Sequence, residues 1–197
     1  MVGVLEDVRR HATPALKREG DMVVVIGSGS EVTLAGSEYL EIVHGKVAGR
    51  PPEPDLLSGK KTSDLVRRLV ARGLVDTAHD VSGGGGLVAL AEMALAGGLG
   101  FEYDEVELER LISGPGGGRA DVAFFGEGAG EFIVAVPRER WYELQDALAE
   151  VPGYGQIGTV CGDRFKIGGL LDVSLQDLRE AYERDLFGAL GGAEVAH

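Results

Sequence analysis

A run of four glycines, Gly83–Gly86, constrains the fold of this chain more than any other feature of its sequence. The residues before the run, Val75–Ala78, are typical of a short strand, and Leu87–Leu95 has the composition of an alanine-rich helix. Because glycine adopts backbone conformations that other residues avoid, the run permits a sharp turn between the two. We therefore expect a strand, a glycine loop over Ser82–Gly86 and a helix, in that order.

Further elements follow from the pattern of apolar residues, since β-branched runs predict strands and helical spacing predicts helices. The expected strands cover residues 2–5, 22–26, 122–125, 131–136, 156–161, 164–167 and 170–173. The expected helices cover residues 37–43, 65–74, 106–112, 141–151 and about 175–186. Proline and glycine mark connections at residues 11–20, 49–55 and 113–119.

Two of the expected turns are of the hairpin kind. Gly126–Gly130 separates the strands expected at 122–125 and 131–136, and Gly162 with Asp163 separates those at 156–161 and 164–167. The sum predicts an α/β or α+β fold, with a mixed sheet flanked by helices. We expect one domain over 1–197, with a core of about 2–178 and a C-terminal helix and tail over 175–197.

Charge and cysteine content limit the classes of function. A formal net charge of -13 repels a phosphate backbone, so nucleic-acid binding is not expected. The single cysteine, Cys161, excludes an internal disulfide, and no Cys/His cluster is present for a structural metal. The sequence has neither a membrane-spanning run nor a signal-peptide layout, so we expect a cytoplasmic protein without membrane contact.

The glycine loop is the first place where chemistry is expected. Backbone N–H groups at the start of a helix form a cradle for an anion such as phosphate, and Gly84 and Gly85 lie there. Asp80 offers a carboxylate for a divalent cation, and His79 offers a hydrogen bond. The alternative is that the glycines only permit a tight turn, with Asp80 or Ser82 as the helix cap. The loop matches neither a Walker A motif nor a dinucleotide fingerprint.

A second candidate is the turn that contains Gly126 and Glu127, where a carboxylate lies between glycines. Glu127 either meets a metal or a phosphate-bound water, or it is a solvated side chain on a turn. His11, His44 and His197 have no partner spacing, and Cys161 has no basic neighbour. No catalytic residue is therefore expected in this chain.

A series of motifs resembles the synthetase subunit of phosphoribosylformylglycinamidine synthase, in its last domain. The motif at His79–Ser82, with the glycines and helix after it, is the first of them. The other landmarks are 2–8, 13–14, 17–21, 36–40, 43–52, 125–127 and 157–158. The resemblance covers Val2 to about Leu178. It extends to the wider superfamily of aminoimidazole ribonucleotide synthetase, and implies the fold of its C-terminal domain.

The resemblance implies a role in an ATP-dependent ligase of purine biosynthesis. That enzyme converts formylglycinamide ribonucleotide, ATP and glutamine-derived ammonia to formylglycinamidine ribonucleotide, ADP, phosphate and glutamate. ATP and Mg²⁺ are the implied cofactors, with Asp80 as the metal ligand. The expected nucleotide-binding residues are His79, Asp80, Ser82, Gly84, Gly85, Gly126 and Glu127. The implied partners are N-terminal domains of the same enzyme, which carry most of the ATP contacts, the glutaminase and small accessory subunits.

Departures from the family pattern indicate an auxiliary or structural copy of the domain, inactive in isolation. The family carries an acidic residue where this chain has Gly83, and a leucine where it has Gly86. It also carries Ser-Gln and a nearby arginine where Gly128–Glu131 stands, so a grip on the substrate phosphate is missing. The alternative is a non-catalytic docking module for the glutaminase and accessory subunits. Self-association through an exposed apolar face is also expected.

Overall fold

The computed structural model describes residues 4–5, 7–27, 31–113, 118–151 and 153–189. Within these residues, seven strands form one mixed sheet in the order β2-β4-β1-β5-β3-β6-β7. The strands are β1 (Met22–Gly27), β2 (Thr77–Asp80), β3 (Phe101–Tyr103), β4 (Phe132–Val136), β5 (Gly153–Val160), β6 (Arg164–Ile167) and β7 (Leu171–Ser174). Only β3 and β6 pair in parallel, which confirms the expected mixed sheet.

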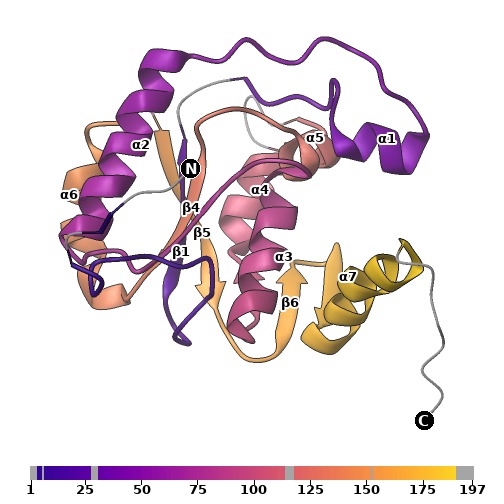
Figure 1. Ribbon diagram of the computed structural model, residues 1–197. Helices are drawn as coiled ribbons and strands as arrows, with labels where there is room; N and C mark the ends of the chain where they lie inside the picture. Colours follow the sequence, from indigo (N-terminus) through magenta and orange to yellow (C-terminus); the bar gives the residue numbers. More distant parts are fainter. Residues whose placement is uncertain (1–3, 6, 28–30, 114–117, 152, 190–197) are drawn as a thin grey trace.

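Helices cover both faces of this sheet (Figure 1). They are α1 (Glu38–His44), α2 (Leu56–Ala71), α3 (Gly85–Gly97), α4 (Glu105–Ser113), α5 (Ala120–Phe125), α6 (Trp141–Leu148) and α7 (Leu175–Ala189), with a 3-10 turn, η1 (Arg138–Arg140). No helix in the described ranges is both long and apolar enough to cross a membrane.

Alternation along β1 explains why both faces need a cover. Val24 and Ile26 pack against α2 and α6, whereas Val23 packs against the layer of α3, α4 and α5. Side chains at successive strand positions point to opposite faces, so an apolar run such as Met22–Ile26 is satisfied only when both faces are buried. The core is therefore double, with the central strands shared between its halves.

α1 begins and ends close to where the sequence predicts, whereas α2 begins nine residues before the predicted start at residue 65. Ser37 caps α1, and its hydroxyl oxygen accepts a hydrogen bond from the Leu40 backbone N–H. Gly45, with a φ of 61°, ends that helix. Asp55 caps α2 by accepting from the N–H groups of Leu57 and Ser58, so this helix begins earlier than the apolar spacing indicates.

The strand predicted at 122–125 is wrong, because these residues lie in α5. Four consecutive apolar residues are too few to separate a strand from a buried helical turn by periodicity. The hairpin-like turn predicted at Gly126–Gly130 is wrong for the same reason, since a helix enters it. Residues 4–5 are not in a strand either, and 2–3 lie outside the described residues, as do 114–117 of the loop expected at 113–119 and 190–197 of the expected tail.

The hairpin predicted at Gly162 and Asp163 is also wrong. β3 lies between β5 and β6, and the Gly100 N–H donates to the Gly162 carbonyl oxygen at 2.8 Å. The inserted strand comes from a segment about sixty residues earlier, so the local turn signal carries no information about it. Gly158 makes room for β3, because a Cβ there would lie 2.2 Å from the Glu102 carbonyl oxygen.

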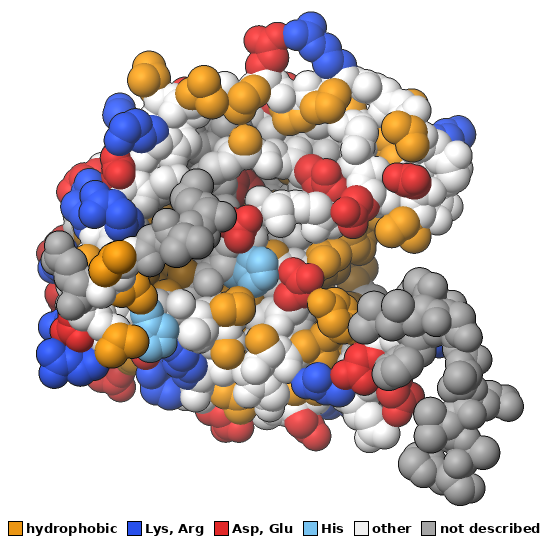
Figure 2. Space-filling model, in the orientation of Figure 1, with side chains coloured by type: hydrophobic (Ala, Val, Ile, Leu, Met, Phe, Trp, Pro, Cys, Tyr) orange, Lys and Arg blue, Asp and Glu red, His pale blue; other side chains and the backbone are white. Residues whose placement is uncertain are grey.

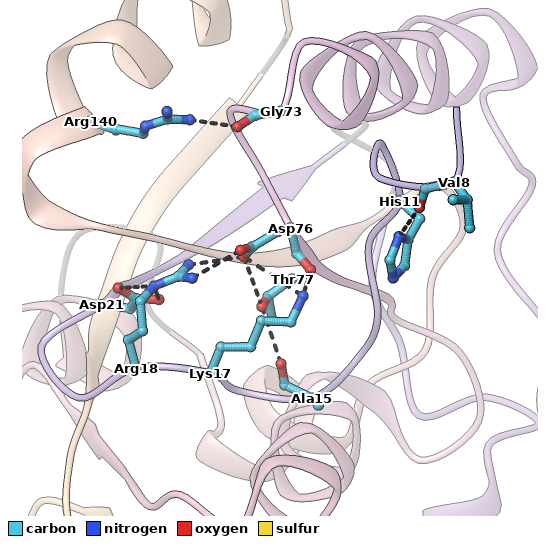
Figure 3. A network of polar contacts seen from close by, with 10 residues as sticks. All are labelled: Val8, His11, Ala15, Lys17, Arg18, Asp21, Gly73, Asp76, Thr77 and Arg140. Carbon is cyan, nitrogen blue, oxygen red and sulfur yellow. Dashed lines mark hydrogen bonds and ion pairs between the residues drawn. The ribbon is translucent and has the colours of Figure 1, made fainter. Parts of the chain in front are cut away.

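A polar network fixes the start of β2 (Figure 3). The guanidinium of Arg18 donates two hydrogen bonds of 2.9 Å to the Asp76 carboxylate and reaches the buried Asp21 at 3.1 Å. The Thr77 hydroxyl donates to the Ala15 carbonyl oxygen at 3.1 Å, and Lys17 donates to the Asp76 carbonyl oxygen. The connection at 11–20 is thus tied to the strand that leads into the glycine loop.

Candidate functional site

The structure confirms the expected order of strand, glycine loop and helix. β2 ends at Asp80, and α3 begins at Gly85. The N-cap is Gly84, with a φ of 82°, and no side chain caps the helix. The side chains of Asp80 and Ser82 therefore do not cap the helix, and the alternative that gave them this role is wrong. Ser82 takes part through its backbone, since its carbonyl oxygen accepts from the Gly85 N–H at 3.1 Å.

The two candidate segments of the sequence lie against each other. A Cβ on Gly85 would lie 2.7 Å from the Gly126 carbonyl oxygen, and one on Gly126 would lie 2.3 Å from the Val122 carbonyl oxygen. Gly85 also has a φ of 75°, a conformation that side chains rarely adopt. Gly85 is therefore required by the close approach of the glycine loop to the end of α5, whereas Gly126 is required by the crowding against Val122 and Val32 at the end of that helix.

Glu127 joins these segments to α1. One of its carboxylate oxygens, Oε1, accepts hydrogen bonds from the Gly84 N–H at 2.9 Å and from the Glu38 N–H at 3.0 Å. Its backbone is held by Thr33, which donates to the Glu127 carbonyl oxygen and accepts from the Glu127 N–H. The solvated-turn alternative for this glutamate is therefore wrong: the carboxylate is a structural bridge between two helix starts.

His79 and Asp80 make a different set of contacts from those of Glu127. His79 is mostly buried, with its Nδ1 2.7 Å from the Asp80 carbonyl oxygen and its Nε2 3.4 Å from a carboxylate oxygen of Glu92. The Asp80 side chain is 66% exposed. Together they line a small open cavity of about 280 Å³ with Pro14, Val66 and Phe132.

This arrangement offers few ligands for a metal. In the described part of the chain, no group of three or more His, Cys, Asp or Glu side chains is close enough to hold an ion. A divalent cation prefers several oxygen ligands, and Asp80 alone supplies one carboxylate. Glu127 already accepts from the Gly84 N–H, so a phosphate would have to displace it there. Among the residues that the structure describes, those at this loop do not complete a Mg²⁺-nucleotide site by themselves.

Three acidic residues near the loop were missed by sequence reasoning. Glu38 lies so close to the loop that a Cβ on Gly83 would be 2.7 Å from its Oε1, and Glu92 contacts His79. Glu131 precedes β4, and burial raises the pKa of its carboxyl. A signal existed for Glu131, because Glu131, Ile133 and Ala135 alternate along one inward face. The other two are brought near by tertiary packing.

Cys161 shows no sign of a nucleophile. Burial, with Glu102 nearby, raises the pKa of its thiol, whereas a reactive cysteine has a lowered one.

Comparison with known proteins identifies relatives over the whole chain. The chain matches the family described as AIR synthase related protein, C-terminal domain, over residues 18–168. It is 36% identical over 200 residues to phosphoribosylformylglycinamidine synthase subunit PurL of an Anaeromyxobacter species, covering 100% of this chain and 26% of that protein. It is 37% identical over 196 residues to the PurL subunit of a Bradyrhizobium species, covering 98% and 25%. The chain thus spans about a quarter of these relatives' length.

Solved structures share the fold. T. maritima PurL complexed with FGAR superposes with a TM-score of 0.70 at 17% identity, covering 87% of this chain and 30% of that one. E. coli HypE superposes with a TM-score of 0.52 at 21% identity, covering 84% and 52%. The mixed sheet with flanking helices is therefore the fold of these proteins' matching domains.

Proposed function

The chain belongs to the AIR synthase related family, as a C-terminal domain of that type, and we propose that it serves as one domain of a phosphoribosylformylglycinamidine synthase in purine biosynthesis. The observation that carries the proposal is the match of the whole chain, at 36% identity, to about a quarter of a PurL subunit. The reaction joins glutamine-derived ammonia to formylglycinamide ribonucleotide with ATP, and it belongs to the larger enzyme in the cytoplasm.

Within that enzyme, the domain is an auxiliary or structural copy with no catalytic residue of its own. The geometry of Glu127 supports this role, because its carboxylate takes the Gly84 N–H that a phosphate would need. The exposed Asp80 supports it as well, since one carboxylate binds Mg²⁺ weakly. Any nucleotide at this loop is held by residues of the other domains. The residues of this chain at the edge of that site are His79, Asp80, Ser82, Gly84, Gly85, Gly126 and Glu127.

Exchange of the matching quarter of a bacterial PurL subunit for this chain tests the proposal. We expect the chimera to form formylglycinamidine ribonucleotide from ammonia and ATP at a rate within about tenfold of the parent, whereas the truncated parent forms none. The measurement is product formation with purified protein. A folded chimera without activity would contradict the family role.

The auxiliary role has its own test in the same chimera. Asp80→Ala should change kcat by less than about tenfold, because a cation that only positions a structural nucleotide does not stabilise the transition state. Asp146→Ala, a change at an exposed position of α6, is the matched control. A loss of more than about a hundredfold for Asp80→Ala alone would place catalytic Mg²⁺ at this loop.

A docking module for the glutaminase and accessory subunits is the second candidate function. Exposed apolar side chains around the α1–α2 connection favour it, and Figure 2 shows hydrophobic side chains along the top of the molecule. These residues are Ile42, Val43, Val47, Leu56 and Leu57. Such a row is typical of a surface buried in an assembly. Sedimentation of the isolated chain should show self-association through this row, and Leu56→Glu should abolish it.

A further inference from the structure

An apolar cavity lies beneath the start of α3, on the inner side of the layer formed by α3, α4 and α5. Its volume is about 320 Å³, at the lower end of the range for small-molecule pockets, which is about 300–1,000 Å³. Val25, Ile133 and Ile157 form its floor on the sheet, and Leu87 and Leu90 of α3 form one wall. None of the residues assigned above to nucleotide binding lines it except Gly126.

One acidic side chain lies among these apolar walls. Glu131 lines the cavity at the entry to β4, and in the described part of the chain no hydrogen bond or ion pair involves its carboxylate. Burial alone raises the pKa of this group, so no neighbouring cation offsets the loss of hydration. A carboxylate placed in this way is stabilised by a partner with a positive charge.

Two further residues of interest line the cavity. Gly86 lines it, and a Cβ at that position would meet no atom within 4 Å. Tyr103 also lines it, and burial, together with the charges of Glu107 and Asp104, raises the pKa of its hydroxyl to about 12. The hydroxyl therefore stays protonated at neutral pH and is a hydrogen-bond donor or acceptor there.

We propose that this cavity binds a small organic cation, an ammonium or amidinium group on a compact apolar or aromatic body, with the charge paired to Glu131. The apolar walls take the body of the ligand, because burial of hydrocarbon is favourable at about 25 cal/mol per Å². The Glu131 carboxylate makes the site selective for a ligand with a positive charge. This site shares only Gly86 with the glycine loop in its lining and does not depend on the ligase assignment.

Titration of the full chain with benzylamine, followed by amide NMR shifts, tests the proposal, with benzyl alcohol as the neutral isostere. We expect benzylamine to bind at least about tenfold more tightly than benzyl alcohol. The largest shifts should fall on Leu87, Leu90 and Ile133. Absence of binding by benzylamine, or shifts that lie elsewhere, would overturn the proposal.

Two variants separate charge pairing from simple apolar binding. Glu131→Gln should weaken benzylamine by at least about tenfold and leave benzyl alcohol within about threefold. Glu109→Gln, at an exposed position of α4, is the matched control and should change neither. Equal affinity of benzylamine for the wild type and Glu131→Gln would refute the pairing.

Gly86→Leu tests the location independently, because Gly86 lines the cavity and a Cβ there meets open space, so a leucine side chain adds bulk at the lining. It should weaken both ligands by at least about tenfold. Gly169→Leu, where a Cβ also meets open space, is the control away from the cavity. Unchanged binding of both ligands in Gly86→Leu would overturn the assignment to this cavity.

Discussion

The contacts of Glu127 explain how two glycine-rich segments, the glycine loop and the turn after α5, are held together. Its Oε1 accepts from the N–H groups of Gly84 and Glu38, so it satisfies donors at the start of both α3 and α1. A helix start without such a partner leaves these donors to water or to a ligand. In this chain the loop is closed by the protein's own carboxylate.

Replacement of Glu127 by alanine should therefore destabilise the fold. We expect Glu127→Ala to lower the free energy of unfolding by about 2 kcal/mol, since two hydrogen bonds from backbone N–H groups to its carboxylate are lost. Glu127→Gln keeps an acceptor oxygen and should cost less than about 1 kcal/mol. Urea denaturation measures both, with Glu109→Ala as a control expected within about 0.5 kcal/mol of the wild type. Equal losses for the alanine and glutamine variants would show that the hydrogen bonds are not the cause.

Replacement of Arg18 should also lower the free energy of unfolding. It pairs with Asp76 and with the buried Asp21, so Arg18→Met leaves a buried carboxylate without its partner. We expect a loss of about 2 kcal/mol, less than for a fully buried pair because the Arg18 side chain is 42% exposed. The control is Arg67→Met, because Arg67 is 71% exposed and lies 3.7 Å from Asp64, and this change should cost under about 0.5 kcal/mol.

The ion pair between Arg18 and Asp76 should also make the stability of the fold depend on pH. Arg18 holds the pKa of Asp76 below its usual value, against an opposing effect of burial. The stability from this pair is complete above the unfolded pKa of about 3.9 and is lost as pH falls through the lowered folded pKa. The difference between the wild type and Arg18→Met should thus shrink below about pH 4. A difference that stays constant down to pH 3 would exclude charge pairing as its origin.

At the scale of elements, two glycines of α3 should respond to alanine in opposite directions. A Cβ on Gly97 would lie 2.1 Å from the Leu16 carbonyl oxygen, so Gly97→Ala forces the helix away from the connection at 11–20 and should cost about 3 kcal/mol. A Cβ on Gly86 meets nothing within 4 Å, so Gly86→Ala should add about 0.5 kcal/mol by raising helix propensity. Thermal or urea unfolding of both variants gives the two signs.

Elements with a clear apolar pattern were predictable from sequence, whereas α5 and β3 were not. The helix at 141–148 has apolar positions at helical spacing, and the strands at 22–27 and 132–136 are apolar runs rich in β-branched residues, which indicates their type. α5 has six residues, and β3 has three residues with no run of its own. β3 is a strand because β5 and β6 lie on either side of it, and this pairing comes from the tertiary fold.

The candidate site was likewise predictable from sequence only in part. The strand, loop and helix around His79, Asp80 and the glycines follow from local sequence, because glycine marks the turn whatever packs on it. The contact of Glu127 with Gly84 joins positions 43 residues apart, and that of Glu127 with Glu38 joins positions 89 apart. No local pattern encodes such pairs, so the function of Glu127 as a bridge required the structure.

For the whole molecule, the sheet separates the core into two halves that should behave as independent units. Ile26 belongs to the half under α2 and α6, and Ile167 belongs to the half under α3 and α4. They lie on β1 and β6, which are three places apart in the sheet, or roughly 14 Å at about 4.8 Å per strand. Sites at this distance without shared partners contribute additively to stability.

We therefore expect Ile26→Val and Ile167→Val each to lower the free energy of unfolding by about 1 kcal/mol, and the double variant by their sum within about 0.5 kcal/mol. A contrasting pair lies within one half, where the rings of Phe101 and Phe165 are 5.7 Å apart. Replacement of both by leucine should deviate from additivity by more than about 0.5 kcal/mol, because each removes part of the other's contacts. If the coupling free energy between Ile26 and Ile167 is as large as that between the two rings, the two halves of the core are not independent and are coupled through the strands they share.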